Sequence, residues 1–363
     1  MFPEKAVKLK PNILNLTLDE LSRWFQDRGI QAYRAGQVLK WVHRHQSDDF
    51  EEMSNISKAH RALLAQHFDI RRLCITEVAE SADGSRKYLF QLDDGRHVES
   101  VRMPERDHDT LCVSSQVGCA QGCRFCVTGS GGLQRNLTVA EIVSQVRDIL
   151  DESIRPRPLT NIVFMGMGEP LANYDNLRRA LEMLTDNRYG YSFAQRRITV
   201  STAGLVSNMA ALGNDTKVNL AISLNAADNA TRDRLMPINR LFPLERLMDA
   251  CRAYPLPSGR RITFEYILLK GLNDTLHDAR KLVKLLHGVR CKVNLIPFNS
   301  HEGCEFKRPD QGTILAFQKV LLDAHYTAII RQSKGQDISA ACGQLRARAL
   351  NIEHGARGVE ENS

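Results

Sequence analysis

The apolar residues near the start of the chain recur at helical spacing. Leu21, Trp24 and Phe25 fall on one face of a predicted helix. This helix follows Thr17, with Glu20 three residues later, which is the pattern of a capping box. Similar spacing predicts further helices, so we expect a small helical module at the N-terminus. These further helices are predicted over residues 32–45 and 56–68.

Two short strands are predicted after this module. Residues 86–92 and 97–103 are strand-like and flank Asp93-Asp94-Gly95, a sequence typical of tight turns between antiparallel strands. We therefore expect a β-hairpin that connects the helical module to the rest of the chain.

From residue 110 onward, short apolar runs alternate with longer amphipathic segments. The segment 138–150 is one of the predicted helices, and Thr138 and Glu141 again form a capping-box pattern. Strand–helix units at roughly 30-residue spacing predict an α/β fold with a parallel sheet, either doubly wound or curled towards a barrel. Ligands of such folds bind at the carboxyl ends of the strands. The predicted strands are residues 110–115, 161–165, 197–201, 218–224, 262–269, 292–298 and 327–332.

Composition and charge exclude several classes of protein. The 363 residues are 43% hydrophobic and 25% charged, which excludes a disordered, collagen-like or coiled-coil chain. No apolar run approaches the about 18 residues of a membrane helix, and no secretory signal is visible at the N-terminus. We therefore expect a cytoplasmic protein without a membrane partner. The net charge of +7 permits an anionic partner but does not demonstrate one.

The strongest chemical signal is a cluster of three cysteines. Cys119, Cys123 and Cys126 lie in a loop that also contains Gly118 and Gly122, so their thiolates can converge on one inorganic centre. Iron–sulfur clusters use closely spaced cysteines, whereas structural zinc needs four ligands. Three cysteines would leave one iron of a four-iron cluster free. Spacing alone leaves open a cluster, a zinc site completed by another thiol, or three unrelated cysteines. The nine cysteines are an odd number, and we expect no structural disulfide in a reducing compartment.

The spacing Cys119-x3-Cys123-x-Phe125-Cys126 resembles the signature of radical S-adenosylmethionine (SAM) enzymes. The longer segments CVSSQVGCAQGCRFCVTG, MGMGEPL, AISLN, VNLIPFN and DISAACGQL resemble the RlmN/Cfr family of adenosine C2/C8 RNA methyltransferases, to about residue 348. The resemblance implies an α/β fold with a partial (βα)6 TIM-like barrel as the radical SAM core. The implied divisions are an N-terminal helical RNA-binding accessory domain (1–84), a β-hairpin connector (85–104), the radical SAM core (105–338) and a C-terminal segment (339–363).

The same resemblance implies two cofactors. In the family, the residues that match Cys119, Cys123 and Cys126 bind one 4Fe-4S cluster, and its open iron binds SAM. One electron, from a donor such as flavodoxin or ferredoxin, then cleaves SAM to a deoxyadenosyl radical. Many family members have His at the position of Asn225, and both side chains can form hydrogen bonds. The residues that match the family's SAM contacts are Gly168, Glu169, Ser201, Ser223, Leu224, Asn225 and Asn299.

Three further roles are implied by similarity. Cys342 would carry a methyl group from a first SAM as S-methylcysteine, and the radical made from a second SAM would activate it for addition to adenine. Glu99 would accept the C2 proton, with Glu105 as a second candidate for this base. Cys112 would then attack the sulfur of Cys342 and release the RNA, leaving a disulfide. Without the family segments, Cys112 and Cys342 are typical of small buried apolar residues.

The implied function is methylation of C2 of an adenosine in the peptidyl-transferase centre of 23S rRNA, and of the adenosine 3′ of the anticodon in tRNAs. One alternative is Cfr-like methylation of adenine C8, although Pro170 after Glu169 is more similar to the C2 branch. Another is a non-catalytic zinc- and RNA-binding module. Basic residues of the N-terminal module could contact RNA phosphate or could form an ordinary solvated surface. These residues are His43, Arg44, His45, Arg71 and Arg72.

Overall fold

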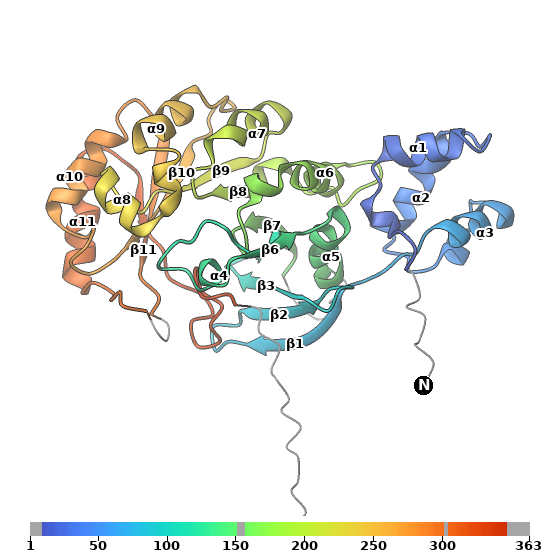
Figure 1. Ribbon diagram of the computed structural model, residues 1–363, viewed down its shortest axis with the longest axis horizontal. Helices are drawn as coiled ribbons and strands as arrows, with labels where there is room; N and C mark the ends of the chain where they lie inside the picture. The colour runs from blue at the N-terminus through green and yellow to red at the C-terminus, as the bar shows by residue number, and fades with distance from the viewer. Residues whose placement is uncertain (1–8, 151–156, 301–303, 347–363) are drawn as a thin grey trace, which may run out of the picture.

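The computed structural model describes residues 9–150, 157–300 and 304–346. In these ranges, ten strands form one sheet with the order β1-β2-β3-β4-β7-β8-β9-β10-β11-β12 (Figure 1). The strands from β4 to β12 pair in parallel, and those from β1 to β4 are antiparallel. The parallel strands are β4 (Asp109–Cys112), β7 (Leu159–Phe164), β8 (Ile198–Thr202), β9 (Asn219–Ser223), β10 (Ile262–Leu268), β11 (Cys291–Pro297) and β12 (Ala328–Ile330).

The parallel part confirms the predicted partial barrel. In the described residues, six strands from β4 to β11 are each followed by at least one helix, and Figure 1 shows these helices around the outside of the sheet. Each of the seven predicted strands is present. The helices of this part are α4 (Val127–Ser130), α5 (Val139–Leu150), α6 (Tyr174–Thr185), α7 (Met209–Asp215), α8 (Asn229–Leu235), α9 (Leu244–Ala253), α10 (Leu276–Leu285) and α11 (Gln311–Asp323).

The predicted hairpin is present as β2 (Arg86–Gln91) and β3 (His97–Pro104). It continues the main sheet, because β3 also pairs with β4. The sequence analysis missed the edge strand β1 (Cys74–Glu80), which pairs with β2. Most of its side chains are exposed, so it has no buried face that could produce an alternating apolar pattern.

The N-terminal module consists of α1 (Leu18–Gln26), α2 (Tyr33–His43) and α3 (Lys58–His67), which confirms the three predicted helices. The Thr17–Glu20 capping box is formed, with both reciprocal hydrogen bonds present. The same two bonds join Thr138 and Glu141 at the start of α5.

Buried polar contacts attach this module to α5. The Arg147 side chain on α5 is fully buried, and it donates to Asp48 at 2.8 Å and to the carbonyls of Gln46 and Ser47. Burying a guanidinium without hydrogen-bond partners costs free energy, so these three bonds favour the arrangement in which the segment around Asp48 packs against α5. No helix among the described residues is long and apolar enough to cross a membrane.

Candidate active site

The three-cysteine loop is closed by a small antiparallel pair of strands, β5 (Gln116–Gly118) and β6 (Leu133–Asn136). Gly118 has a φ of 75°, and a Cβ there would lie 2.0 Å from the Gly132 carbonyl oxygen. Only glycine fits this position, because any side chain would clash with the returning backbone. The two ends of the segment from Gly118 to Gly132, which contains the three cysteines and α4, are therefore held close together.

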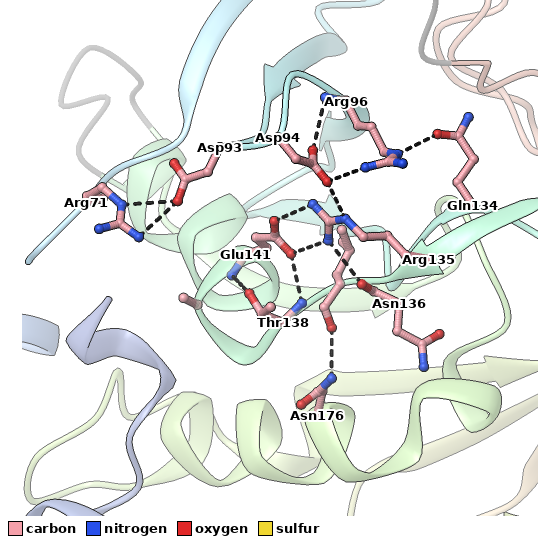
Figure 2. A network of polar contacts seen from close by, with 12 residues as sticks. Arg71, Asp93, Asp94, Arg96, Gln134, Arg135, Asn136, Thr138, Glu141 and Asn176 are labelled. Carbon is pink, nitrogen blue, oxygen red and sulfur yellow. Dashed lines mark hydrogen bonds and ion pairs between the residues drawn. The ribbon is translucent and has the colours of Figure 1, made fainter. Parts of the chain in front are cut away.

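A polar network fixes β6 to its surroundings (Figure 2). Arg135 of β6 donates to Asp94, in the turn between β2 and β3, at 2.6 Å, and to Glu141 of α5 at 2.8 Å. Arg96 also contacts Asp94 at 2.6 Å, and the two arginines hold the pKa of that carboxyl below its ordinary range. One guanidinium thus connects the cysteine loop with the hairpin and the first barrel helix.

The three cysteines line a cavity of about 150 Å³, which we call the inner cavity. The carboxyl ends of β7, β8 and β9 form much of its wall, as expected for an α/β fold. Two predicted SAM contacts lie elsewhere. The side chain of Leu224 is in the hydrophobic core, and Asn299 lines a neighbouring cavity. The predicted cofactor contacts that line the inner cavity are Gly168, Glu169, Ser201, Ser223 and Asn225.

Glu169 is held in place by backbone hydrogen bonds. Its carboxylate accepts from the amides of Leu171 at 3.0 Å and Ala203 at 2.7 Å, and burial raises its pKa to about 7. The preceding Gly168 has a φ of 99°, and a Cβ there would lie 2.5 Å from the Cβ of Gln116. The segment that carries Glu169 is therefore packed against the strand leading into the cysteine loop.

The Asn225 side chain is already engaged. Its Oδ1 accepts from the Ile267 amide at 2.8 Å, and its Nδ2 lies 3.3 Å from the Met236 sulfur. Asn225 also has a left-handed φ of 57°, a conformation that asparagine tolerates better than most residues. Asn225 therefore lines the inner cavity and also binds the β10 backbone, which forms part of the same wall.

The chemistry of the cysteine loop suits an iron–sulfur cluster. Burial raises the pKa of Cys119 to about 11 and that of Cys123 further, and the neighbouring thiolates raise the pKa of Cys123 as well. Cationic iron would offset this clustered negative charge. Among the described residues, no three His, Cys, Asp or Glu side chains are grouped to bind a single metal ion.

A second cavity of about 670 Å³, the outer cavity, shares Cys126, Glu265 and Cys342 with the inner one. Cys112 of β4 and Cys342 both line it. Cys342 is an exposed residue. Desolvation of its thiol by the surrounding protein, and then the Glu265 carboxylate, raise its pKa to about 11. Burial, and then the Cys342 thiolate, raise the pKa of Cys112. All nine cysteines lie in the described ranges and are free thiols.

The two candidate bases lie on different cavities. Glu105 lines the outer cavity with Cys112 and Cys342. Glu99 lines a third space of about 860 Å³, the side cavity, together with Cys126. The Glu99 carboxylate contacts Lys87 at 3.1 Å and accepts from the Arg346 amide at 2.8 Å, so it is tied to the segment that carries Cys342.

Sequence reasoning missed Glu265. This residue is almost fully buried in β10, accepts a hydrogen bond from Asn294 of β11 at 2.9 Å, and has a pKa raised by burial. It faces both the inner and the outer cavity. The available signal was a carboxylate inside the apolar run ITFEYILL, since buried acidic residues are rare.

The arginines proposed from sequence as RNA contacts are engaged within the protein. Arg71 bonds to Asp69 at 2.9 Å and to Asp93 at 3.0 Å, and Arg72 bonds to Asp48 at 2.9 Å. His43 is buried, and burial lowers its pKa to about 3. A different basic set lies around the outer cavity, and in the described ranges its members form no ion pair with a carboxylate. This set is Arg196, Arg197, Lys292, Arg331 and Lys334.

Comparisons with known proteins agree with this geometry. Residues 11–70 match the ribosomal RNA large subunit methyltransferase N-terminal domain, and residues 113–286 match the radical SAM superfamily. The chain is 57% identical to the dual-specificity RNA methyltransferase RlmN of Desulfosudis oleivorans, over 94% of this chain and 92% of that protein. It is 54% identical to the RlmN of Geobacter sulfurreducens, over 96% of each. A crystal structure of a radical SAM methyltransferase from Sphaerobacter thermophilus is 43% identical, with a TM-score of 0.87, and the match covers 93% of this chain and all of that one.

Proposed function

Because this chain belongs to the RlmN family of radical SAM RNA methyltransferases, we propose that it methylates C2 of adenosine in two RNAs. The targets are an adenosine in the peptidyl-transferase centre of 23S rRNA and the adenosine 3′ of the anticodon in tRNAs. The observation that carries this proposal is that Cys112 and Cys342 line one cavity, which opens at Cys126 onto the cysteine loop. This is the arrangement that a methyl-carrying thiol and a resolving thiol require.

Cys119, Cys123 and Cys126 would hold the 4Fe-4S cluster, and the inner cavity together with the adjoining part of the outer cavity, which Asn299 lines, would hold SAM. When bound, the two cofactors supply a radical, which is needed because C2 of adenine is electron-poor and cannot displace a methyl group from a sulfonium. The Glu169 carboxylate, which lines the inner cavity, would also accept hydrogen bonds from the SAM ammonium group. Ser201, Ser223, Asn225 and Asn299 are the side chains that would bind the rest of SAM, with Leu224 contributing through its backbone.

Cys342 would act as the methyl carrier. Its sulfur loses a proton, forms a bond to the methyl carbon of the first SAM, and S-adenosylhomocysteine leaves. After the methyl carbon has become bonded to adenine C2, the Cys112 sulfur attacks the Cys342 sulfur. The sulfur–carbon bond breaks, its electron pair stays with the carbon on adenine, and that carbon takes up a proton to complete the methyl group. The methylated RNA leaves, and a disulfide remains for an external thiol to reduce. Both thiols have raised pKa values, so each must lose its proton during its own step rather than beforehand.

Glu99 is our choice as acceptor of the C2 proton. Its hydrogen bond to the Arg346 amide, four residues after Cys342, supports this role because it ties the carboxylate to the methyl-carrying segment. Glu105 lines the cavity of the two thiols and is the alternative base.

The cations around the outer cavity, which form no ion pair with any described carboxylate, support RNA as the substrate. Arg196 and Arg197 lie just before β8, Lys292 is in β11, and Arg331 and Lys334 follow β12. Phosphate contacts supply much of the affinity of RNA-binding proteins. The target adenosine would leave its stack and enter the cavity, whose volume lies within the roughly 300–1,000 Å³ typical of small-molecule sites.

The electron would come from a flavodoxin- or ferredoxin-type donor, and the side cavity exposes Cys123 and Cys126 to such a partner. The enzyme would work in the cytoplasm, where its free thiols stay reduced.

Mass spectrometry of nucleosides tests the proposed function. The purified, reconstituted enzyme is incubated with SAM, a reductant and either a 23S rRNA fragment or a tRNA transcript. We expect 2-methyladenosine in both RNAs, and its loss from cells that lack the gene. Formation of 8-methyladenosine would identify the Cfr-like alternative, and no modified adenosine in either RNA would overturn the proposal.

A further inference from the structure

A separate cavity of about 440 Å³ lies where α2 meets the segment after α6. We call it the aromatic cavity, because three aromatic residues line it together with polar side chains. The described residues of its wall include no carboxylate. Its principal members are Tyr33, Gln37, Lys40, Trp41, Asn55 and Tyr189.

The aromatic rings of this cavity are accompanied by cations. Tyr33 is 55% exposed, and the Arg34 guanidinium lies 4.8 Å from the centre of its ring. The Arg188 guanidinium lies 5.4 Å from the centre of the Tyr189 ring. Such alternation of rings and basic groups is typical of sites for unpaired RNA, where bases stack on aromatic residues and cations meet the phosphates.

Close packing fixes the cavity across two parts of the chain. Gly36 of α2 lies against Tyr189, and a Cβ at that glycine would be 2.6 Å from the tyrosine ring. Arg44 at the end of α2 donates to the Asn187 carbonyl at 3.1 Å. Trp41 donates its indole N–H to the Asn55 side chain at 2.7 Å, so the ring orientation is also set. The wall is therefore preorganised before any ligand binds.

We propose that the aromatic cavity binds an unpaired nucleotide of the RNA substrate, with its base against the aromatic rings and its phosphates near Lys40 and His45. The inference rests on the proposed function only in taking RNA as the substrate. The side-chain oxygens of Gln37 and Asn55 already accept from Arg34 and Trp41, so these two amides offer their NH2 groups as donors to acceptor atoms on the edge of a base.

One short segment connects this cavity with the outer cavity. Tyr189 lines the aromatic cavity, and Arg196, seven residues later, lines the outer cavity. At no more than about 3.6 Å per residue, their Cα atoms are at most about 25 Å apart. About seven stacked nucleotides of one strand, at 3.4 Å each, cover this distance. A nucleotide near the target adenosine can therefore reach the aromatic cavity while the adenosine occupies the outer one.

Binding measurements with the cluster-containing enzyme test the inference, using a tRNA transcript and a 23S rRNA fragment as probes. We expect Tyr33→Ala to weaken RNA binding about 10-fold, because one base–aromatic stack is lost. We expect Lys40→Ala to lower the slope of log affinity against log salt by about 1. Tyr33→Phe, which keeps the ring, and Lys319→Ala, on the exposed face of α11, are the matched controls and should bind as the parent enzyme does.

Two further readouts keep the test independent of folding and of catalysis. SAM cleavage without RNA should be the same in every variant, since none of these residues lines the inner or outer cavity. Ultraviolet cross-linking of the parent enzyme should join RNA to the peptides that contain Tyr33, Trp41 or Tyr189. Unchanged RNA affinity in both alanine variants, or cross-links only elsewhere, would overturn the inference while leaving the methyl-transfer reaction intact. A parent enzyme that binds RNA through this cavity but methylates no adenosine would instead refute the proposed function.

Discussion

Cys112 and Cys342 line one cavity, although the first lies in β4 and the second lies in the segment after β12. The charge of the Cys342 thiolate raises the pKa of Cys112, which also indicates that the two groups are close. If Cys342 carries the methyl group and Cys112 resolves the adduct, their substitutions should fail differently.

We expect Cys112→Ala to accumulate RNA covalently joined to the protein, because only the resolving thiol is missing. Cys342→Ala should form no adduct, because it cannot be methylated. A denaturing gel with and without ribonuclease separates these outcomes. An adduct formed by Cys342→Ala would show that the two roles have been assigned the wrong way round.

Loss of one cluster thiol should remove the cluster. We expect Cys123→Ala to lose both the brown iron–sulfur absorbance and reductive SAM cleavage, because a three-thiolate site has no spare ligand. Iron analysis and visible spectroscopy of the reconstituted protein measure this. Cys251→Ala, a buried cysteine in α9 that does not line the inner cavity, is the control and should keep full absorbance. Full four-iron absorbance in Cys123→Ala would exclude Cys123 as a ligand.

Glu169→Gln should weaken SAM binding by about 10-fold or more, because hydrogen bonds to charged groups contribute roughly 1.5–3 kcal/mol. The amide has almost the same shape, but its NH2 group cannot accept a hydrogen bond, so one of the bonds from the Leu171 and Ala203 amides is lost as well and adds to the effect. Equilibrium binding of SAM to the cluster-containing enzyme measures the effect. Glu182→Gln, on the exposed side of α6, should leave SAM affinity unchanged. Equal affinity in the two variants would remove Glu169 from the SAM site.

The two candidate bases can be separated by substitution. We expect Glu99→Gln to form the covalent adduct and release little product, because the C2 proton cannot be removed, whereas Glu105→Gln should remain active. Product formation and adduct level are measured in the same reaction. An inactive Glu105→Gln enzyme that accumulates adduct, beside an active Glu99→Gln enzyme, would transfer the role to Glu105.

His43 should make the N-terminal module sensitive to acid. Burial lowers its pKa to about 3, while its ordinary value is 6.5, so between these values the unfolded chain binds a proton that the folded protein does not. Its contribution to stability is therefore complete above pH 6.5 and decreases as the pH falls towards 3, by up to about 1.4 kcal/mol per pH unit.

Comparison with His43→Phe isolates this effect from other titrating groups. The variant should lose less stability than the parent protein between pH 7 and pH 5. Both tryptophans, Trp24 and Trp41, lie in the helical module, so denaturant unfolding followed by their fluorescence reports on this part. The prediction would be contradicted if the free energy of unfolding fell by the same amount in both proteins between pH 7 and pH 5.

The sequence by itself determined most of the elements and restricted the chemistry of the cysteine cluster to a few alternatives. Periodicity of two or of 3.6 residues is a local property, so it located the seven parallel strands, the hairpin and the N-terminal helices. The capping boxes at Thr17 and Thr138 are equally local, since their hydrogen bonds join residues three apart. The cysteine spacing restricted the chemistry for the same reason, because all three ligands lie in one loop.

Only the tertiary structure decided which side chains are available and which share a cavity. The sequence shows Arg71 and Arg197 as equal charges, but folding places carboxylates beside Arg71 while Arg197 remains at the outer cavity. Strand β1 was likewise not predictable, because its exposed residues are ordered by backbone pairing with β2 rather than by burial. The meeting of Cys112 with Cys342 depends on long-range strand pairing and on burial, which no local pattern encodes.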